Sequence, residues 1–228
     1  GKSKEAEIVY RNVLKINPDI SMAHSKIIQI LSSHCRWDEI EKYSPYLNKI
    51  GIEGKAIDPL TLMYIEDNPL NHLKRAIKCT EEKKIEELPI INYKKNNKIN
   101  IGYFSSDFRN HSITHQLIRT LELHDKSKFE VYAYSLSNIK DVYTNRVKNA
   151  VSVFREINTL SDLDIIKLAR NDQLDIAIDL NGFTQNNRIS IFYYRVAPIQ
   201  INYLGYTGSL GSNSFDYIIA DKVLIPEE

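Results

Sequence analysis

The sequence has little of several features that define whole classes of protein. It contains two cysteines in 228 residues, too few for a disulfide scaffold, so we expect a reducing, cytoplasmic environment. Its 30 basic and 29 acidic residues leave a net charge of +1, which argues against a polybasic nucleic-acid binder. No apolar run approaches the ~18 residues of a membrane helix, and the polar start is no signal peptide. We therefore expect neither nucleic acid nor a membrane as a partner.

The composition is otherwise that of a folded protein. With 43% hydrophobic and 26% charged residues, the chain can bury a real core, and its length suits one to two domains. The chain starts at Gly1 rather than at a methionine, and it stops abruptly at Glu228. We therefore expect a fragment of a longer protein.

The first fifty residues show helical periodicity. In residues 5–18 the apolar positions follow helical spacing, and Pro18 ends the helix. A second amphipathic stretch covers residues 21–34. A third is expected from Trp37, with Asp38 as its cap, to about Gly51. The apolar face expected of the first helix consists of Ala6, Val9, Tyr10, Val13 and Leu14.

This spacing also matches the second helix of a tetratricopeptide repeat, a motif with a period of about 34 residues. Residues 20–50 would form a following, more degenerate repeat, although an ordinary helical hairpin gives the same pattern. We assign residues 1–50 to repeat-like helices. Residues 51–97 are assigned to a helical connector (helices near 60–65 and 70–84, broken by Pro59, Pro69 and Pro89) that ends in the polar linker 93–98.

From residue 98 the pattern changes to alternating strands and helices. Strands are expected at 99–104, 129–134, 151–157, 174–180, 199–204 and 217–220, and helices at 112–124, 142–149, 162–171 and 188–195. This alternation predicts an α/β fold in which residues 98–228 form a Rossmann-like, doubly wound, mostly parallel sheet. Ligands of such sheets bind beyond the carboxyl ends of the strands, so the loops there are the candidate sites.

The loop after the first strand, residues 105–115, gathers hydroxyls, a carboxylate, a guanidinium and two imidazoles. His111 lies at the expected helix start, where an imidazole is suited to proton transfer, and is our catalytic candidate. His115, one turn further on, is interpreted as structural. Two histidines four residues apart could bind a metal, but no third ligand with recognisable spacing follows, so we expect no metal site.

Two later loops supply candidate substrate-binding residues. In the loop after the fourth strand, Asn181 and Thr184 offer neutral donors and acceptors, and Gly182 permits a close backbone approach. Asp179 is either a functional carboxylate or a cap for nearby backbone.

The third loop, residues 204–212, is rich in glycine and hydroxyl groups and can wrap a phosphate or a sugar. Its candidate binding residues are Tyr206, Thr207, Gly208 and Ser209. It has neither the dinucleotide-binding glycine pattern nor a P-loop, and the chain has no nucleophile elbow of an α/β-hydrolase.

These loops contain ordered motifs: IGYFSSDFRNH at 101–111, DLNGFT at 179–184, APIQ at 197–200 leading to LGY at 204–206, and FDYIIAD at 215–221. Over about 120 residues they resemble the O-linked N-acetylglucosamine transferase family, glycosyltransferase family 41. That family carries tetratricopeptide repeats before its catalytic region, so the resemblance covers the end of the repeats, a connector and the first catalytic lobe.

The resemblance implies a GT-B glycosyltransferase that uses UDP-N-acetylglucosamine, inverts the anomeric carbon, needs no metal or other cofactor and modifies Ser or Thr hydroxyls of proteins. His111 matches the family's active-site histidine, a base or a contact to the donor substrate. The loop 205–209 matches the segment bordering sugar and acceptor. The repeats imply a protein or peptide acceptor held in their groove.

The sequence also departs from the family. Thr207 stands where proline is usual, and Phe183 where Tyr or His is common. The second lobe, which holds most of the UDP-binding residues, is absent, so we expect this fragment to be inactive alone. The alternatives are a non-catalytic adaptor that binds proteins through its repeats, and a related UDP-hexose transferase with a different acceptor.

Overall fold

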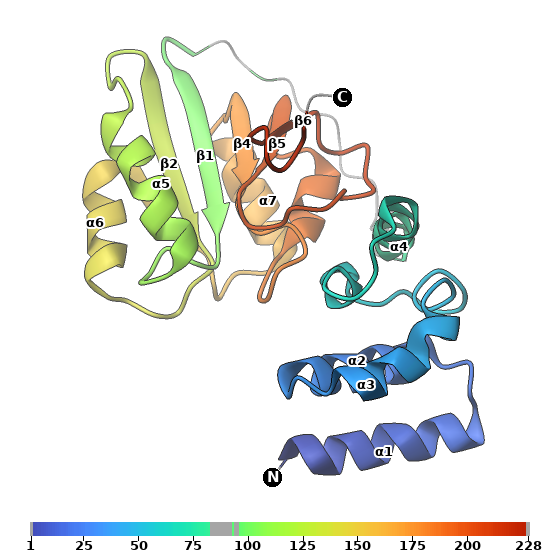
Figure 1. Cartoon of the computed structure of the whole chain (residues 1–228). Coiled ribbons are helices and arrows are strands. Elements are labelled where there is room, and N and C mark those ends of the chain that lie inside the picture. Colours follow the sequence, from blue (N-terminus) through green and yellow to red (C-terminus); the bar gives the residue numbers. More distant parts are fainter. Residues whose placement is uncertain (1, 83–92, 94–95, 227–228) are drawn as a thin grey trace. The chain divides into compact units, whose positions relative to one another are not determined.

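The computed structural model describes residues 2–82, 93 and 96–226, and these fall into two compact units (Figure 1). The helical unit comprises residues 1–84 together with 208–212, and the α/β unit comprises residues 85–207 and 213–228. Residues 83–92 and 94–95, which include Pro89 and parts of the expected connector helix and linker, lie outside the described residues. Within the described ranges, no helix is both long and apolar enough to cross a membrane.

The helical unit begins with a hairpin of two α-helices, as expected. Helix α1 spans Lys2–Ile16 and α2 spans Ser21–Ser33. The side chains of Ile27, Ile28 and Leu31 on α2 are fully buried, and Tyr10 and Leu14 of α1 pack against this cluster. Burial of this apolar stripe is what holds the hairpin together.

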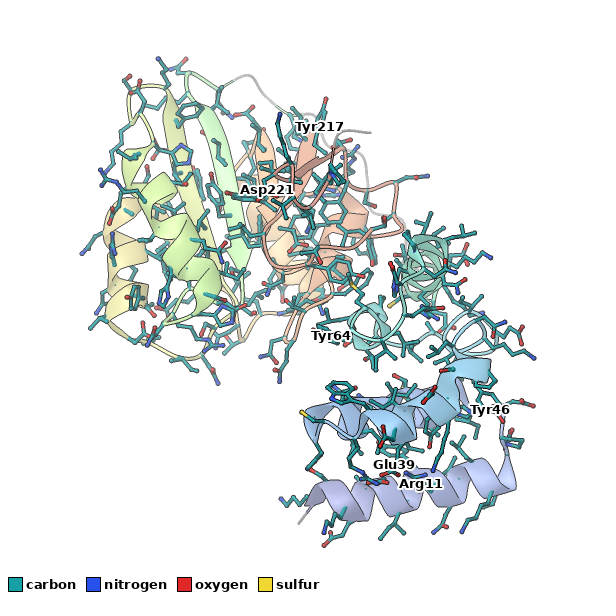
Figure 2. All side chains as sticks on the ribbon, viewed as in Figure 1. Arg11, Glu39, Tyr46, Tyr64, Tyr217 and Asp221 are labelled. Carbon is teal, nitrogen blue, oxygen red and sulfur yellow. The ribbon has the colours of Figure 1, made fainter. Side chains whose placement is uncertain are left out.

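The packed face of α1 differs from the expected one at Val9, whose side chain is 59% exposed. Glu7 is buried instead, where Arg36 Nη1 donates to its Oε2 at 2.6 Å and Arg11 Nε donates to its Oε1 at 2.8 Å. Figure 2 shows Arg11 facing Glu39, to which it is paired at 3.1 Å. The prediction from apolar spacing failed here because a carboxylate that is paired with arginines can be buried where an apolar side chain was expected.

The prediction of the third helix was wrong in its length and in its N-cap residue. Helix α3 covers only Trp37–Ile40 and continues as the 3₁₀ helix η1, Glu41–Tyr46. Arg36 occupies the N-cap, and Asp38 lies in the first turn. Pro45 lies inside η1, and its missing amide hydrogen prevents the regular α-helical bonds from continuing.

The rest of the helical unit is anchored by a buried cation. The 3₁₀ helix η2 spans Pro59–Leu62, and α4 spans Pro69–Glu81. Arg75 of α4 is fully buried, donates to the Ile50 carbonyl at 2.8 Å and pairs with Glu66. Because every side of this guanidinium is buried, its partners fix how α4 packs on the segment before it.

The described residues of the α/β unit form a six-stranded, wholly parallel sheet in the order β3-β2-β1-β4-β5-β6 (Figure 1). This confirms the expected doubly wound fold. The strands are β1 (Ile99–Ser105), β2 (Phe129–Ser135), β3 (Val153–Glu156), β4 (Ile176–Asp179), β5 (Ile199–Tyr203) and β6 (Tyr217–Ile219). The helices are α5 (Ser112–Leu123), α6 (Val142–Ala150), α7 (Asp162–Asn171) and the 3₁₀ helix η3 (Ile189–Tyr194).

Both faces of the sheet are covered by helices. On one face, Ile101 and Tyr103 of β1 share a core with Leu117 of α5 and Val147 of α6. On the other, Phe104 shares a core with residues of α7 and η3. Successive β1 side chains therefore enter different cores, as the two-residue period of a strand requires.

The strand order places the ends of β1 and β4 side by side. The chain runs outward from β1 to β3 on one side and from β4 to β6 on the other, so β1 and β4 are neighbours where the order reverses. Crevices at such a reversal are the usual ligand sites of doubly wound sheets. The loops that follow β1 and β4 meet at this position.

We predict a contrast between two leucines of α5. Leu117 is fully buried, and Leu123 is 64% exposed. Leu117→Ala should lower the free energy of unfolding by about 2–5 kcal/mol because it opens a cavity, while Leu123→Ala should change it by less than ~0.5 kcal/mol. Urea unfolding followed by circular dichroism measures both. Equal losses for the two variants would contradict this packing.

Candidate active site

His111 is the N-cap of α5, so the loop after β1 positions it directly. Its backbone is extended (φ −154°, ψ 151°), and its Nδ1 accepts a hydrogen bond from the Ile113 amide at 3.3 Å. Its Nε2 lies 3.8 Å from Asp107 Oδ1, and about a third of its side chain is exposed. The imidazole is therefore anchored on one edge and accessible from solvent.

Asp107 is the buried carboxylate of the same loop. Its Oδ1 accepts from the Arg109 guanidinium at 3.1 Å, and its Oδ2 accepts from Ser106 Oγ at 3.0 Å. Its backbone amide donates to Ser105 Oγ at 2.9 Å, and its carbonyl accepts from the Thr114 hydroxyl. These hydrogen bonds hold the loop after β1 in one conformation, starting from Ser105, the last residue of the strand.

The side chain of Asn181 joins the loop after β4 to the loop after β1. Its Oδ1 accepts from the Ser106 amide at 2.8 Å, and its Nδ2 donates to Ser106 Oγ at 2.8 Å and to Asp107 Oδ2 at 3.1 Å. The same Nδ2 lies 3.0 Å from Thr184 Oγ1, within its own loop. Asn181 is 2% exposed, so its carboxamide is committed to these protein groups.

Asp179 caps the backbone of the β4 loop, which is one of the two roles considered for it. Its Oδ1 accepts from the Asn181 amide at 3.0 Å, and its Oδ2 accepts from the Gly182 amide at 2.8 Å. The carboxyl group is buried. Burial raises its pKa to about 6, and the two backbone hydrogen bonds only partly oppose this.

Two glycines allow the loop after β5 to lie on the loop after β4. Gly182 has a φ of +55°, and a Cβ there would be 2.4 Å from Tyr206 Cβ. A Cβ on Gly205 would be 2.1 Å from the Leu180 carbonyl oxygen. The buried Tyr206 ring meets Phe183 edge-on, with centroids 5.3 Å apart. Any side chain at either glycine would separate the loops.

The structure therefore brings together most of the predicted site residues. His111, Asn181, Gly182, Thr184 and Tyr206 belong to one cluster of loops at the carboxyl edge of the sheet. Thr207 is exposed and is the last residue of the stretch 85–207 that belongs to the α/β unit.

Two further candidates, Gly208 and Ser209, fall in the helical unit. In the same segment, the Leu210 carbonyl accepts from Thr80 Oγ1 at 3.3 Å, and Gly211 lies against the backbone of Ile77. The glycine-rich loop is thus divided between the units, which its composition gave no means of predicting.

Asp141, which was not predicted, supports the loop of His111 from the loop after β2. Its Oδ2 accepts from the Asn110 amide at 2.6 Å, and its Oδ1 caps α6. These backbone hydrogen bonds, that from Asn110 foremost, lower its pKa. Asn110 Oδ1 in turn lies 2.9 Å from His115 Nε2, the structural role expected of that histidine. The capping pattern of Asp141 with Thr144 was readable in the sequence, but its contact to Asn110 was not.

Comparison with known proteins identifies the class. The fold and the loop cluster define a Rossmann-like lobe whose candidate site lies at the switch between β1 and β4. Residues 74–228, about two thirds of the chain, match the model of glycosyl transferase family 41. The chain belongs to this family.

Curated relatives carry related names. The chain is 34% identical over 130 residues to the probable UDP-N-acetylglucosamine–peptide N-acetylglucosaminyltransferase SEC of Arabidopsis thaliana, covering 57% of this chain and 13% of the relative. It is 36% identical over 132 residues to the Caenorhabditis elegans UDP-N-acetylglucosamine–peptide N-acetylglucosaminyltransferase, covering 57% and 11%. The chain thus spans a small part of these relatives.

A solved structure shows the same fold. A mutant O-GlcNAc transferase of Thermobaculum terrenum superposes with a TM-score of 0.74 at 22% identity, covering 100% of this chain and 45% of that one. The fold of the described residues is therefore that of the corresponding part of this enzyme.

We predict that Asn181→Ala destabilises the loop cluster. It leaves the buried Ser106 amide and Asp107 Oδ2 each without one partner, so the free energy of unfolding should fall by about 2–4 kcal/mol. Hydrogen exchange at the Ser106 amide should also accelerate. Asn149→Ala, on the exposed face of α6, is the control and should stay within ~0.5 kcal/mol. Unchanged exchange at Ser106 would count against the bridging role.

A second prediction concerns the pH dependence of stability. Between the ordinary pKa of 3.8 and about 6, the folded chain retains a proton on Asp179 that the unfolded chain has released. Its contribution to the free energy of unfolding therefore falls as pH rises through this window, by up to ~3 kcal/mol. The free energy of unfolding of the unsubstituted chain, minus that of Asp179→Asn, should therefore be larger at pH 4 than at pH 6.5.

Denaturant unfolding of both chains across this range measures the difference. The control is Asp125→Asn, because hydrogen bonds from Ser127 lower the pKa of the exposed Asp125. The contribution of Asp125 to stability is lost as pH falls. The difference in free energy of unfolding between the unsubstituted chain and Asp125→Asn should therefore change with pH in the opposite direction. A pH-independent difference for Asp179→Asn would contradict the buried, proton-retaining carboxyl.

Proposed function

We propose that this chain forms part of an inverting GT-B glycosyltransferase that moves N-acetylglucosamine from UDP-N-acetylglucosamine to Ser or Thr hydroxyls of proteins. The observation that carries the proposal is the cluster of His111, Asn181, Gly182 and Tyr206 at the β1–β4 switch point of a family 41 chain. The names of its relatives, which are UDP-N-acetylglucosamine–peptide N-acetylglucosaminyltransferases, support the donor and the acceptor.

The residues of the cluster suit this reaction in part. Inverting transfer needs charge compensation at the leaving diphosphate and a group that deals with the proton of the acceptor hydroxyl. The partly exposed His111 imidazole and the glycine-rich loops suit the sugar and acceptor side. Arg109 is already paired with Asp107, so we assign the diphosphate mainly to a second lobe outside residues 1–228. No metal or other cofactor enters the proposal.

The helical unit would serve the acceptor. Its helices α1 and α2 share an apolar core, and we propose that they belong to tetratricopeptide repeats that hold the protein or peptide substrate. The two cysteines of the sequence and the proposed action on proteins favour the cytoplasm as the place of the reaction.

The test is a transfer assay. The open reading frame that contains this chain should move labelled N-acetylglucosamine from UDP-N-acetylglucosamine to Ser- or Thr-containing peptides, while residues 1–228 alone should show no transfer. In the complete protein, His111→Ala should lower kcat/KM by about 100-fold or more, because a positioned proton-handling or charge-stabilising group is lost.

The control on the same helix as His111 is Leu123→Ala, a change at an exposed position of α5, and this variant should keep the full rate. Peptide binding without transfer of any UDP-sugar would replace this proposal by the adaptor function. Transfer of a different hexose would change the donor and keep the class.

A further inference from the structure

The glycine-rich loop after β5 is held at two points, one in each unit. In the α/β unit, the Tyr206 side chain is buried, and its ring meets Phe183 edge-on with centroids 5.3 Å apart. In the helical unit, the Leu210 side chain is buried, and the Leu210 carbonyl accepts from Thr80 Oγ1 of α4 at 3.3 Å. Residues 207–209 are therefore anchored on both sides.

The anchor in the helical unit requires a glycine at position 211. Gly211 has a φ of +62°, and a Cβ there would be 2.3 Å from the Ile77 nitrogen and 2.5 Å from the Ala76 carbonyl carbon. Both are backbone atoms inside α4, so no side-chain rotation could relieve the overlap. Gly211 thus allows the loop to lie directly on the backbone of the helix, in a conformation that other residues rarely adopt.

Helix α4 is a rigid support for this anchor. Arg75, in the turn that Gly211 contacts, is fully buried, donates to the Ile50 carbonyl at 2.8 Å and pairs with Glu66. The Glu66 carboxylate also accepts from Asn71 Nδ2 at 2.6 Å. These contacts fix the turn, because moving it would leave a buried guanidinium without its partners.

The three residues between the anchors are candidates for substrate binding. Thr207 and Ser209 are exposed, and Gly208 is half-buried. A three-residue connection between fixed ends has few conformations available to it. Its hydroxyl and amide groups therefore take their positions from α4 as well as from the sheet.

We infer that α4 positions the sugar-side loop of the proposed transferase, and that Gly211 is the positioning residue through which it does so. This rests on the proposed function. Gly211 acts through residues 207–209, whose hydroxyl and amide groups suit a phosphate or a sugar. Displacing the anchor would weaken binding of the sugar nucleotide without removing any group that binds it.

Gly211→Ala in the 228-residue chain tests the anchor without any assay of transfer. The added methyl group does not fit against the α4 backbone, so the loop should detach from the helix. Nuclear magnetic resonance relaxation should show the amide order parameters of residues 207–211 falling from about 0.85 to below about 0.6. Unchanged order parameters would overturn the inference.

The matched control is Gly54→Ala. Gly54 has a φ of +67°, but a Cβ there would meet only Ser21 Oγ, at 4.0 Å. This variant adds the same kind of backbone strain to the helical unit without the overlap, and it should leave the order parameters of residues 207–211 unchanged.

A second variant, Leu210→Ala, removes a buried side chain from the same anchor and adds no backbone strain. It should mobilise residues 207–209 as well. If Gly211→Ala does not fold, which its backbone amide spectrum reveals, Leu210→Ala decides: rigid residues 207–209 in that variant would overturn the inference.

Steady-state kinetics of the complete protein separate positioning from a loss of folded enzyme. Gly211→Ala should raise the KM for UDP-N-acetylglucosamine by about tenfold or more, because a misplaced loop binds the substrate less well. Gly54→Ala should keep both kcat and KM. A lower kcat with an unchanged KM would show only a smaller folded fraction and would overturn the positioning role. Absence of transfer by the unsubstituted protein would refute the proposed function and leave the relaxation result standing.

Discussion

The loop cluster depends on one carboxamide. Asn181 accepts from the backbone of the β1 loop through Oδ1 and donates to two side chains of that loop through Nδ2. Only a side chain with a donor and an acceptor on one planar group can do both, since a carboxylate lacks the donors and an apolar residue lacks both. Because β1 and β4 are neighbours only where the strand order reverses, this bridge ties the candidate site to the topology of the sheet.

Holding the loops this way requires polar groups in the interior. Asp179 is buried beneath them with a raised pKa, because its two backbone partners do not fully replace water. Beside it, Asn202 Oδ1 has no hydrogen-bond partner among the described residues. A sequence selected only for stability would fill such positions with apolar side chains, so this polar layer is the kind of local conflict expected under a functional site.

Periodicity predicted the elements of the α/β unit well, because its central strands and its helices bury regular apolar faces. The alternation along β1 and the helical stripe of α5 report directly on the two cores. Prediction failed where a polar side chain is buried in place of an apolar one, or where a proline interrupts the helical hydrogen bonds. Glu7 is buried by two arginines where the pattern favoured Val9, and Pro45 converts an expected α-helix into a 3₁₀ segment.

For the site, the sequence placed the candidate residues in strand-end loops that the structure brings together, but it could not assign chemistry within them. Strand-end positions follow from the local pattern, whereas the adjacency of the loops after β1 and β4 follows from strand order, which no local pattern encodes. The functional reading of His111 depends on a finer feature still. An imidazole at a helix start predicts proton transfer, yet the same position makes Nδ1 the cap of α5. The hydrogen bond that fixes the ring also occupies the Nδ1 lone pair, a constraint that the position of the histidine in the sequence does not show.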